Sequence, residues 1–358
     1  MESVLINLTI LYTFIITTFL SYIFVKQTIK YAHKLDLYDV PNERSHHCSV
    51  KPSGAGIGFV LALFVSFALF EHTLLQQYWY IFLSIFIVFA TGVYDDRHNV
   101  SAKFKFIFIF IAVFLLWFFG ISIDTFGNWY GYNISLPSVF ALLFSMFALA
   151  GFTNALNLID GIDGLSASIS IVILSFFAGL GFEYNSHIIV LLSTSTIAVL
   201  IGFLFLNWNP AKIFMGDSGS LTLGFIISIL AVLSIKYIHP IAIIYLTAIP
   251  ILDTLIVMIR RIRRGKSPFS PDKTHIHHIM VKFFDMNVKK TVVFLSILQI
   301  IFSSIGYMLL DSINKNNGHN IPLFALIGFM FMFVIFYMIF TGIKKRQNFI
   351  ELLQKRRK

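Results

Sequence analysis

The sequence predicts an all-α polytopic membrane protein with about eleven transmembrane helices, its N-terminus outside the cell and its C-terminus inside. Of the 358 residues, 57% are apolar and only 12% are charged, which is outside the range of soluble domains. The mean hydropathy is +0.82, and about eleven crossings of roughly 20 residues would use about 220 positions, which is close to the apolar fraction. Because Cys48 is the single cysteine, neither a disulfide-rich secreted fold nor a zinc-thiolate site is expected.

Long apolar runs without charge mark the predicted membrane spans. The first run lacks the basic leading segment and the cleavage site of a signal peptide, and further spans follow it, so we expect it to remain a membrane helix. The short outer loops, with ordinary polar residues such as Asp124, are expected to be simple connectors. In chain order the predicted spans are 5–25, 54–71, 79–94, 104–121, 137–156, 165–182, 188–206, 219–235, 239–259, 291–310 and 321–342.

The basic residues set the predicted orientation. With the N-terminus outside, 25 of the 27 Lys and Arg residues fall in segments that face the cytoplasm, and only Lys236 and Lys315 fall elsewhere. Basic residues favour the cytoplasmic side in short loops such as these. The net charge of +10 therefore reports membrane topology, and no nucleic-acid partner is expected. We treat 1–358 as one membrane domain, with a cytoplasmic loop at 260–290 and a basic cytoplasmic tail at 343–358.

Five polar clusters fall on the cytoplasmic side of this topology, which indicates one shared site. The first is Asp95 and Asp96 at the inner end of the third span, followed by Lys103 and Lys105 at the start of the fourth. Adjacent carboxylates point in different directions on a helix, so one can face a cleft while the other pairs with a cation or metal. Taken alone, such a pair is more often a solvated helix end.

The second cluster is a polar ladder at the end of the fifth span. Asn154, Asn157, Asp160 and Asp163 follow one another at three-residue steps, which on a helix places neighbours about one turn apart. A glycine after each aspartate lets the backbone turn or a ligand approach closely. These groups at the end of an apolar span would be costly without a ligand, an ion or a polar partner, so a functional role is favoured over a structural one.

The third and fourth clusters each contain one carboxylate. Asp217 lies in NWNPAKIFMGDSGS, which begins at Asn207, close to glycines at the entry of a helix. It suits Mg2+, which takes one or two protein carboxylates and fills its shell with phosphate oxygens and water. Asp217 or Ser218 could also cap the helix, and both roles can hold. Asp253 lies inside an apolar run, where a functional role and a structural pairing with another helix are about equally supported.

The fifth cluster combines guanidinium and imidazole groups in the loop at 260–290. Clustered groups of this kind suit a diphosphate or a nucleotide, because Arg binds phosphate oxygens in a bidentate manner. A triple-histidine zinc site is disfavoured because two of the histidines are adjacent in sequence, and simple anchoring to anionic lipid is a further alternative. The residues are Arg260, Arg261, Arg263, Arg264, His275, His277 and His278.

With these motifs in order along its whole length, the chain resembles the polyprenyl-phosphate N-acetylhexosamine-1-phosphate transferases. This family includes bacterial undecaprenyl-phosphate N-acetylglucosaminyl 1-phosphate transferases and the peptidoglycan phospho-MurNAc-pentapeptide translocase. The translocase branch has three consecutive histidines and no SPFSPD stretch. The chain has Ser53 before Gly54-Ala55-Gly56, where relatives often have an arginine and three glycines. The motifs are VPNERSHH with KPSGAGIGF, YDDR, NALNLIDGIDGL, NWNPAKIFMGDSGS and RRIRRGKSPFSPDKTHIHH.

The resemblance implies roles for individual residues. Asp95 and Asp96 would be the paired catalytic carboxylates, with Asp160 and Asp163 also catalytic, and Asp217 would hold Mg2+, for which Mn2+ can substitute. The implied substrate-binding residues are Lys105, Asn154, Asn157, Asn207, Arg260, Arg261, Arg263, Arg264, His275, His277 and His278.

The implied reaction transfers N-acetylhexosamine 1-phosphate, with N-acetylglucosamine favoured, from a UDP-sugar to undecaprenyl phosphate and releases UMP. It would initiate a lipid-linked O-antigen, capsule or related envelope glycan at the cytoplasmic face of the bacterial inner membrane. Relatives are often homodimers. The alternatives are the translocase reaction and, in another class, a transporter or lipid flippase, which would need polar groups at the midplane or on both faces.

Overall fold

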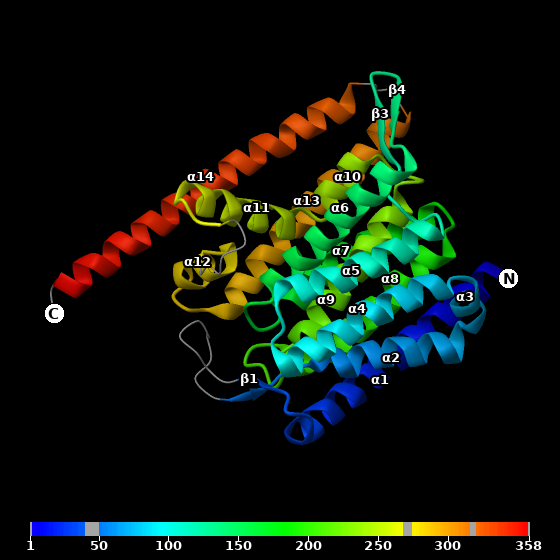
Figure 1. Cartoon of the computed structure of the whole chain (residues 1–358), viewed down its shortest axis with the longest axis horizontal. Coiled ribbons are helices and arrows are strands. Elements are labelled where there is room, and N and C mark those ends of the chain that lie inside the picture. The colour runs from blue at the N-terminus through cyan, green and yellow to red at the C-terminus, as the bar shows by residue number, and fades with distance from the viewer. Residues whose placement is uncertain (1, 40–49, 268–273, 316–319, 357–358) are drawn as a thin grey trace.

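The computed structural model describes residues 2–39, 50–267, 274–315 and 320–356. The VPNERSHH motif, Cys48 and the SPFSPD stretch beyond Ser267 lie outside these residues. The described chain is mostly helical (Figure 1), which agrees with the predicted all-α membrane architecture. The helices are α1 (Glu2–Leu35), α2 (Ala55–Phe70), α3 (His72–Gln77), α4 (Trp79–His98), α5 (Ala102–Phe118), α6 (Ser138–Ile159), α7 (Leu165–Glu183), α8 (His187–Asn207), α9 (Gly216–Ser234), α10 (Pro240–Leu246), α11 (Ala248–Arg263), α12 (Ile276–Phe283), α13 (Val288–Lys315) and α14 (Ile321–Arg356).

Eight helices within the described residues are long and apolar enough to cross a membrane, or nine if the bent pair α10–α11 counts as one span. Helix α2 is apolar but shorter. The outermost helices continue beyond the apolar runs that predicted them, since α1 ends at Leu35 and α14 at Arg356. The number, length and apolar composition of these helices indicate a multi-pass membrane protein.

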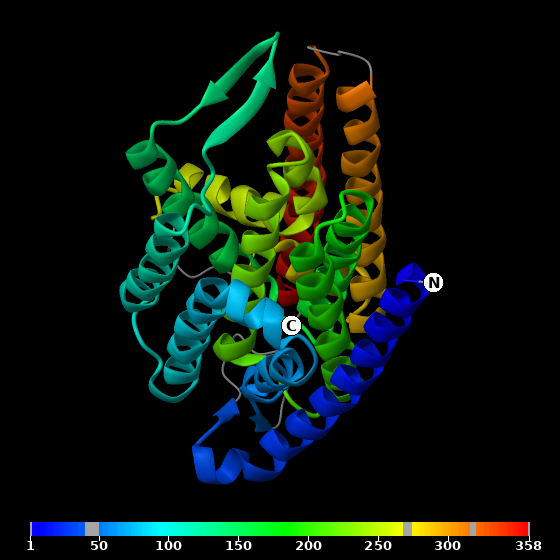
Figure 2. The same cartoon turned by 90° about the vertical axis from the view of Figure 1, so that its right-hand side faces the viewer.

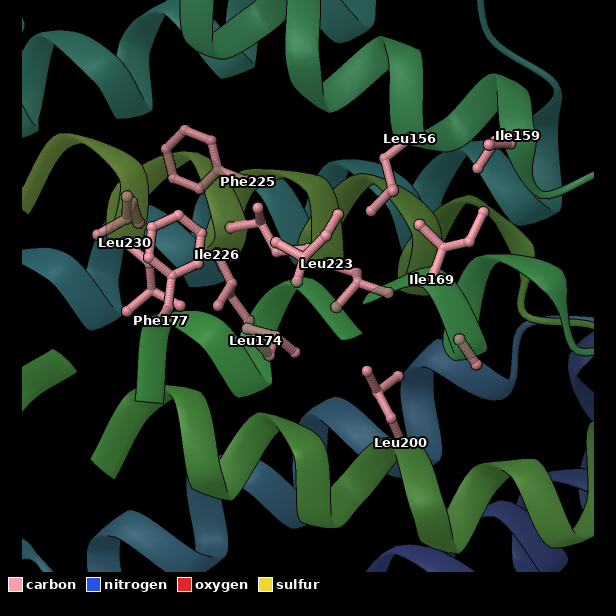
Figure 3. Packing of buried hydrophobic residues seen from close by; sticks show 14 of the residues in the cluster. Leu156, Ile159, Ile169, Leu174, Phe177, Leu200, Leu223, Phe225, Ile226 and Leu230 are labelled. Carbon is pink, nitrogen blue, oxygen red and sulfur yellow. The ribbon is translucent and has the colours of Figure 1, made fainter. Parts of the chain in front are cut away.

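Helix α9 forms the centre of the bundle. It packs against α2, α4, α6 and α7. In its most apolar stretch 83% of the residues are buried, compared with 22% in α1 and in α14. Figure 3 shows Leu223 and Phe225 of α9 among buried side chains of neighbouring helices, including Leu156 of α6 and Phe177 of α7. This apolar packing holds the polar first turn of α9 in a fixed place.

Glycines allow α2 and α4 to approach the first turn of α9 closely. A Cβ atom on Gly56 would lie 2.0 Å from the backbone nitrogen of Gly219, and one on Gly92 would lie 2.5 Å from the carbonyl oxygen of Asp217. The backbone nitrogens of Ala55 and Gly56 also donate to the carbonyl oxygens just before α9. Three segments that are distant in sequence therefore meet at the start of α9.

The predicted span 239–259 is not one straight helix, because α10 and α11 meet at an angle of 84°. Pro250 has no backbone N–H, so the carbonyl oxygen of Leu246 lacks its helical donor. Gln299 of α13 donates to that oxygen at 2.9 Å and accepts from the backbone nitrogen of Ile249 at 3.0 Å. The break therefore follows from proline chemistry, and a buried amide satisfies the backbone groups that it frees.

One of the loops predicted to be simple outer connectors is a β-hairpin, β3 (Thr125–Trp129) and β4 (Tyr132–Ser135). Tyr130 and Gly131 both have positive φ, as a two-residue hairpin turn of type I′ requires. Trp129 packs against His239 at the start of α10, and burial lowers the pKa of that imidazole. The hairpin signal in the sequence is the Tyr130-Gly131 pair between two short segments that contain Phe126, Trp129 and Tyr132.

The connections separate into two ends of the bundle. In Figure 1, β1 (Tyr38–Asp39) and α12 lie at one end, with the turns that follow α4, α6 and α8, while α3, the hairpin and the N-terminus lie at the other. Figure 2 shows the hairpin projecting beyond the helices. Strand β1 pairs with β2 (Lys51–Pro52). All five polar clusters therefore belong to the end that carries β1 and α12.

Candidate active site

Lys105 bridges two carboxylates from different helices. It lies in the first turn of α5, a helix that Ser101 caps by accepting from the backbone nitrogen of Phe104. Its ammonium group is 2.9 Å from Oδ2 of Asp95, near the end of α4, and 2.6 Å from Oδ2 of Asp217, in the first turn of α9. The ammonium group is therefore shared between two negative charges, each partly shielded from solvent.

Asp96 points away from Asp95 and caps α9. Its two carboxylate oxygens accept from the backbone nitrogens of Asp217 at 2.6 Å and Ser218 at 3.1 Å. A carboxylate at a helix N-terminus satisfies free N–H groups and interacts favourably with the helix dipole. A Cβ atom on Gly216 would lie 2.7 Å from this carboxylate, and its φ is +73°, so glycine suits that position for two reasons.

Asn157 and Ser220 complete the surroundings of Asp217. The amide nitrogen of Asn157 donates to Oδ1 of Asp217 at 2.9 Å and to the hydroxyl of Ser220 at 2.8 Å. The polar ladder of α6 thus reaches the first turn of α9. Both oxygens of Asp217 have a defined donor, one an amide and one an ammonium group.

Asp160 follows α6 and adds a further carboxylate to this region. Burial raises its pKa to about 8, and the nearby charges of Asp217, Asp96 and Asp163 add to the effect. These three carboxylates make the surroundings of Asp160 negative. Within the described residues, Lys105 is the one cation that pairs with Asp95 or Asp217.

Asp163 and Asn207 fasten the loop after α6 to the segment before α9. Asp163 accepts from the amide of Asn209 at 2.8 Å and from the backbone nitrogen of Ala211 at 3.0 Å. Asn207 is buried, accepts from the backbone nitrogen of Gly164 at 2.8 Å and donates to the carbonyl of Ile213 at 2.8 Å. These two predicted site residues therefore hold the loops that carry the cluster.

Asn154 lies one turn before Asn157 on α6 and is half-buried. Among the described residues it makes no hydrogen bond to the acidic cluster. The four polar residues of the ladder therefore have different contacts. Asn157 contacts Asp217 directly, Asp160 lies within reach of its charge, and Asp163 serves the loop.

The histidine segment contacts the acidic cluster at Gly161, the residue after Asp160. A Cβ atom on Gly161 would lie 2.3 Å from Nε2 of His277, so this ring packs directly on the glycine after Asp160. The rings of His275 and His277 are stacked with centroids 5.7 Å apart, and those of His277 and His278 are 4.2 Å apart. His275 and His277 are buried, and His278 is half-buried. The three histidines therefore do form a cluster, but two of the rings are packed inside the protein.

The predicted arginine cluster divides in two. Arg260 and Arg261 are buried, and Arg260 donates to the carbonyl of Thr274 at 2.8 Å. Arg263 and Arg264 are exposed, and Arg263 lies over the ring of Tyr337 in α14 at 5.2 Å and donates to its hydroxyl. Arg260 and Arg261 therefore lie inside the protein, where Arg260 binds the start of the histidine segment, whereas Arg263 and Arg264 lie on the surface.

The donor set fits a hard cation held by few protein ligands. No group of three or more His, Cys, Asp or Glu side chains in the described parts of the chain is arranged as a metal site. Carboxylates from α4, α9 and the loop after α6 nevertheless converge with a single paired ammonium group. Mg2+ requires only one or two carboxylates when phosphate oxygens and water complete its shell.

The sequence patterns did not predict the packing roles of Gly92 and Gly56 or the contact of Asn209 with Asp163. Gly92 and Gly56 permit the close approach to α9, and Asn209 holds Asp163. The available signal was a glycine two residues before Tyr94 in GVYDDR, at helical spacing from the carboxylates. Such a residue is recognisable as a packing contact only when the partner helix is known.

Residues 78–235 match the family model for glycosyl transferase family 4. This segment includes both Asp95 and Asp217. A Bacillus subtilis protein named as a probable undecaprenyl-phosphate N-acetylglucosaminyl 1-phosphate transferase is 32% identical over 76% of this chain and 77% of its own length. An Escherichia coli O157:H7 protein named undecaprenyl-phosphate alpha-N-acetylglucosaminyl 1-phosphate transferase is 28% identical over 91% of this chain and 90% of its own. A Yersinia pestis protein of that name is 29% identical over 74% of each chain.

Proposed function

The chain belongs to glycosyl transferase family 4, and from this membership we propose that it transfers N-acetylhexosamine 1-phosphate from a UDP-sugar to undecaprenyl phosphate, releasing UMP. N-acetylglucosamine is the favoured sugar because the relatives' names specify it. The observation that carries the proposal is the Lys105 bridge between Asp95 and Asp217, within the segment that matches the family. The product would be the first lipid-linked intermediate of an O-antigen, capsule or related envelope glycan.

The proposed topology has eleven spans, which combine the eight long helices, the bent pair, α2 and α5. The N-terminus would lie outside and the C-terminus inside the bacterial inner membrane. This orientation puts the end with β1 and α12 in the cytoplasm, where a soluble nucleotide-sugar is available. The basic residues support it because they concentrate at this end.

The reaction requires two anions to approach each other. A phosphomonoester has a second pKa of about 6, so the lipid phosphate is largely ionised near neutrality and needs little help from a base. Lys105 would screen the approaching phosphates, and Asn157 would keep Asp217 in place. Mg2+, when held by Asp217, would supply neutralising charge at the donor diphosphate.

The other site residues take supporting roles in this proposal. Asp96 holds the first turn of α9, and Asp95 is the carboxylate beside Lys105 that could accept a proton. Asp163 and Asn207 hold the surrounding loops. Of the arginines, Arg263 and Arg264 are exposed enough to meet a nucleotide directly.

The decisive experiment is UMP release by the purified protein with undecaprenyl phosphate and a panel of UDP-N-acetylhexosamines. We expect release with UDP-N-acetylglucosamine that depends on divalent cation and on the lipid. Release only with UDP-MurNAc-pentapeptide would identify the translocase reaction instead. The absence of UMP release with every donor would favour a transporter. Parallel double-reciprocal lines would indicate a covalent sugar-phosphoryl aspartate rather than direct attack.

A further inference from the structure

Asp253 is a carboxylate buried in α11 with both oxygens occupied. Its side chain is 1% exposed. One oxygen accepts from the backbone nitrogen of Ile276 at 2.6 Å, and the other is 2.8 Å from Nδ1 of His275. A buried carboxylate is tolerated when such donors compensate for the lost hydration. A carboxylate oxygen accepts hydrogen bonds, so Nδ1 of His275 donates in this contact.

These two bonds attach the histidine segment to α11. His275 is the N-cap of α12, and Ile276 is the first residue of that helix, so Asp253 satisfies a free N–H group at its start. Arg260, two turns later on α11, binds the carbonyl of Thr274. Residues 274–276 are therefore held at two places by a single helix.

A continuous series of contacts leads from Asp253 to the acidic cluster. His275 is bonded to Asp253 and stacked on His277 with an interplanar angle of 19°. His277 packs on Gly161, and Gly161 follows Asp160. The position of the imidazole rings beside the acidic cluster thus depends on a carboxylate that lies outside it.

We infer that Asp253 is a positioning residue, which fixes the tautomer of His275 and holds the histidine segment against Gly161 beside the acidic cluster. Asp253 itself touches no substrate. The inference rests on the proposed transferase function, in which the clustered guanidinium and imidazole groups of residues 260–278 would bind the diphosphate of the UDP-sugar. A displaced segment would therefore weaken the use of the UDP-sugar, and it would leave the use of the lipid phosphate largely unchanged.

The test compares Asp253→Asn with wild type and with Thr254→Val, a substitution of nearly equal volume at the next residue of α11. The asparagine oxygen can still accept from the backbone nitrogen of Ile276, but the NH2 group that would then face Nδ1 of His275 cannot accept a hydrogen bond. We expect kcat/KM for the UDP-sugar to fall roughly 10- to 100-fold, since small misplacements at a reacting centre have effects of this size. The KM for undecaprenyl phosphate should stay within about two-fold, and Thr254→Val should match wild type.

His275→Asn provides a second variant that keeps the Asp253 side chain and its bond to the backbone nitrogen of Ile276. It should show the same selective loss with the donor. The kcat/KM of the double variant should be no lower than that of the less active single variant, because the effects of two residues that act through one contact do not add. Additive losses, or equal losses with donor and lipid, would overturn the inference.

Hydrogen exchange over residues 274–283 separates this inference from the proposed function. Faster exchange in Asp253→Asn than in Thr254→Val is the expected result. Faster exchange in a protein whose wild type releases no UMP would leave the positioning intact and remove the transferase proposal. Unchanged exchange, or faster exchange with unchanged kinetics, would overturn the positioning role while the transferase proposal stands.

Discussion

At the scale of single residues, the most informative contact is the bridge from Lys105 to Asp95 and Asp217. Helix geometry correctly predicts that Asp95 and Asp96 diverge. It cannot assign a partner to either, because the partners come from α5 and α9. The sequence also cannot show that Asp163 and Asn207 are engaged by loop backbone, since both look like ordinary active-site polar residues.

Replacing Lys105 with Met should lower kcat/KM by about 100-fold or more, since it removes the cation between two carboxylates. In the proposed reaction it also removes the charge that would screen the phosphates. UMP release by monodisperse protein in detergent measures this effect. Lys103→Met is the matched control, because Lys103 lies on the same helix and is exposed. Equal activity in the two variants would contradict the role of the bridge.

The raised pKa of Asp160, about 8, predicts how stability depends on pH. Unfolded aspartate has a pKa near 4, so between about pH 4 and 8 the folded state retains a proton that the unfolded state loses. Stability attributable to this group should therefore fall as pH rises through this window. Asp160→Asn should match wild type near pH 4 and melt at a higher temperature above pH 8.

This comparison is made with a chelator present, because a bound cation would itself lower the pKa of Asp160. The melting temperature of both proteins is measured across the pH range in one detergent. A difference in melting temperature that is independent of pH would show that Asp160 is ionised in the fold throughout.

At the scale of helices, the site depends on how closely α4 approaches α9. Gly92→Ala should destabilise the protein by about 1–3 kcal/mol, because a Cβ atom would lie 2.5 Å from a backbone oxygen of α9 and the first turn of α9 would have to shift. Gly151→Ala on α6 is the control, because nothing lies within 4 Å of its added Cβ atom. Only Gly92→Ala should lower the melting temperature and the activity.

The long apolar runs located the helices well but could not locate the break between α10 and α11. Pro250 was visible in the sequence, yet proline occurs in continuous membrane helices when neighbouring groups satisfy the freed backbone. The angle of 84° is stabilised by Gln299 of α13, a partner that no local pattern indicates. The hairpin of β3 and β4 also differs from the prediction, because a simple connector was expected there.

At the scale of the whole molecule, the proposed orientation can be tested with single cysteines in a Cys48→Ser background. Tyr132→Cys places a thiol in the exposed hairpin, and Lys103→Cys places one at the opposite end. A membrane-impermeant maleimide should label the first in intact cells and the second only after permeabilisation. The reverse pattern would invert the proposed topology.

The sequence by itself determined that the chain lies in a membrane, where its helices are, and that its polar clusters gather at one end. These conclusions follow from composition and charge, which are local properties of the chain. Only the tertiary structure decided that Lys105 joins Asp95 to Asp217 and that Asp253 holds His275. Those pairings depend on helix packing around α9 and on the bend before α11, which involve residues far apart in the sequence.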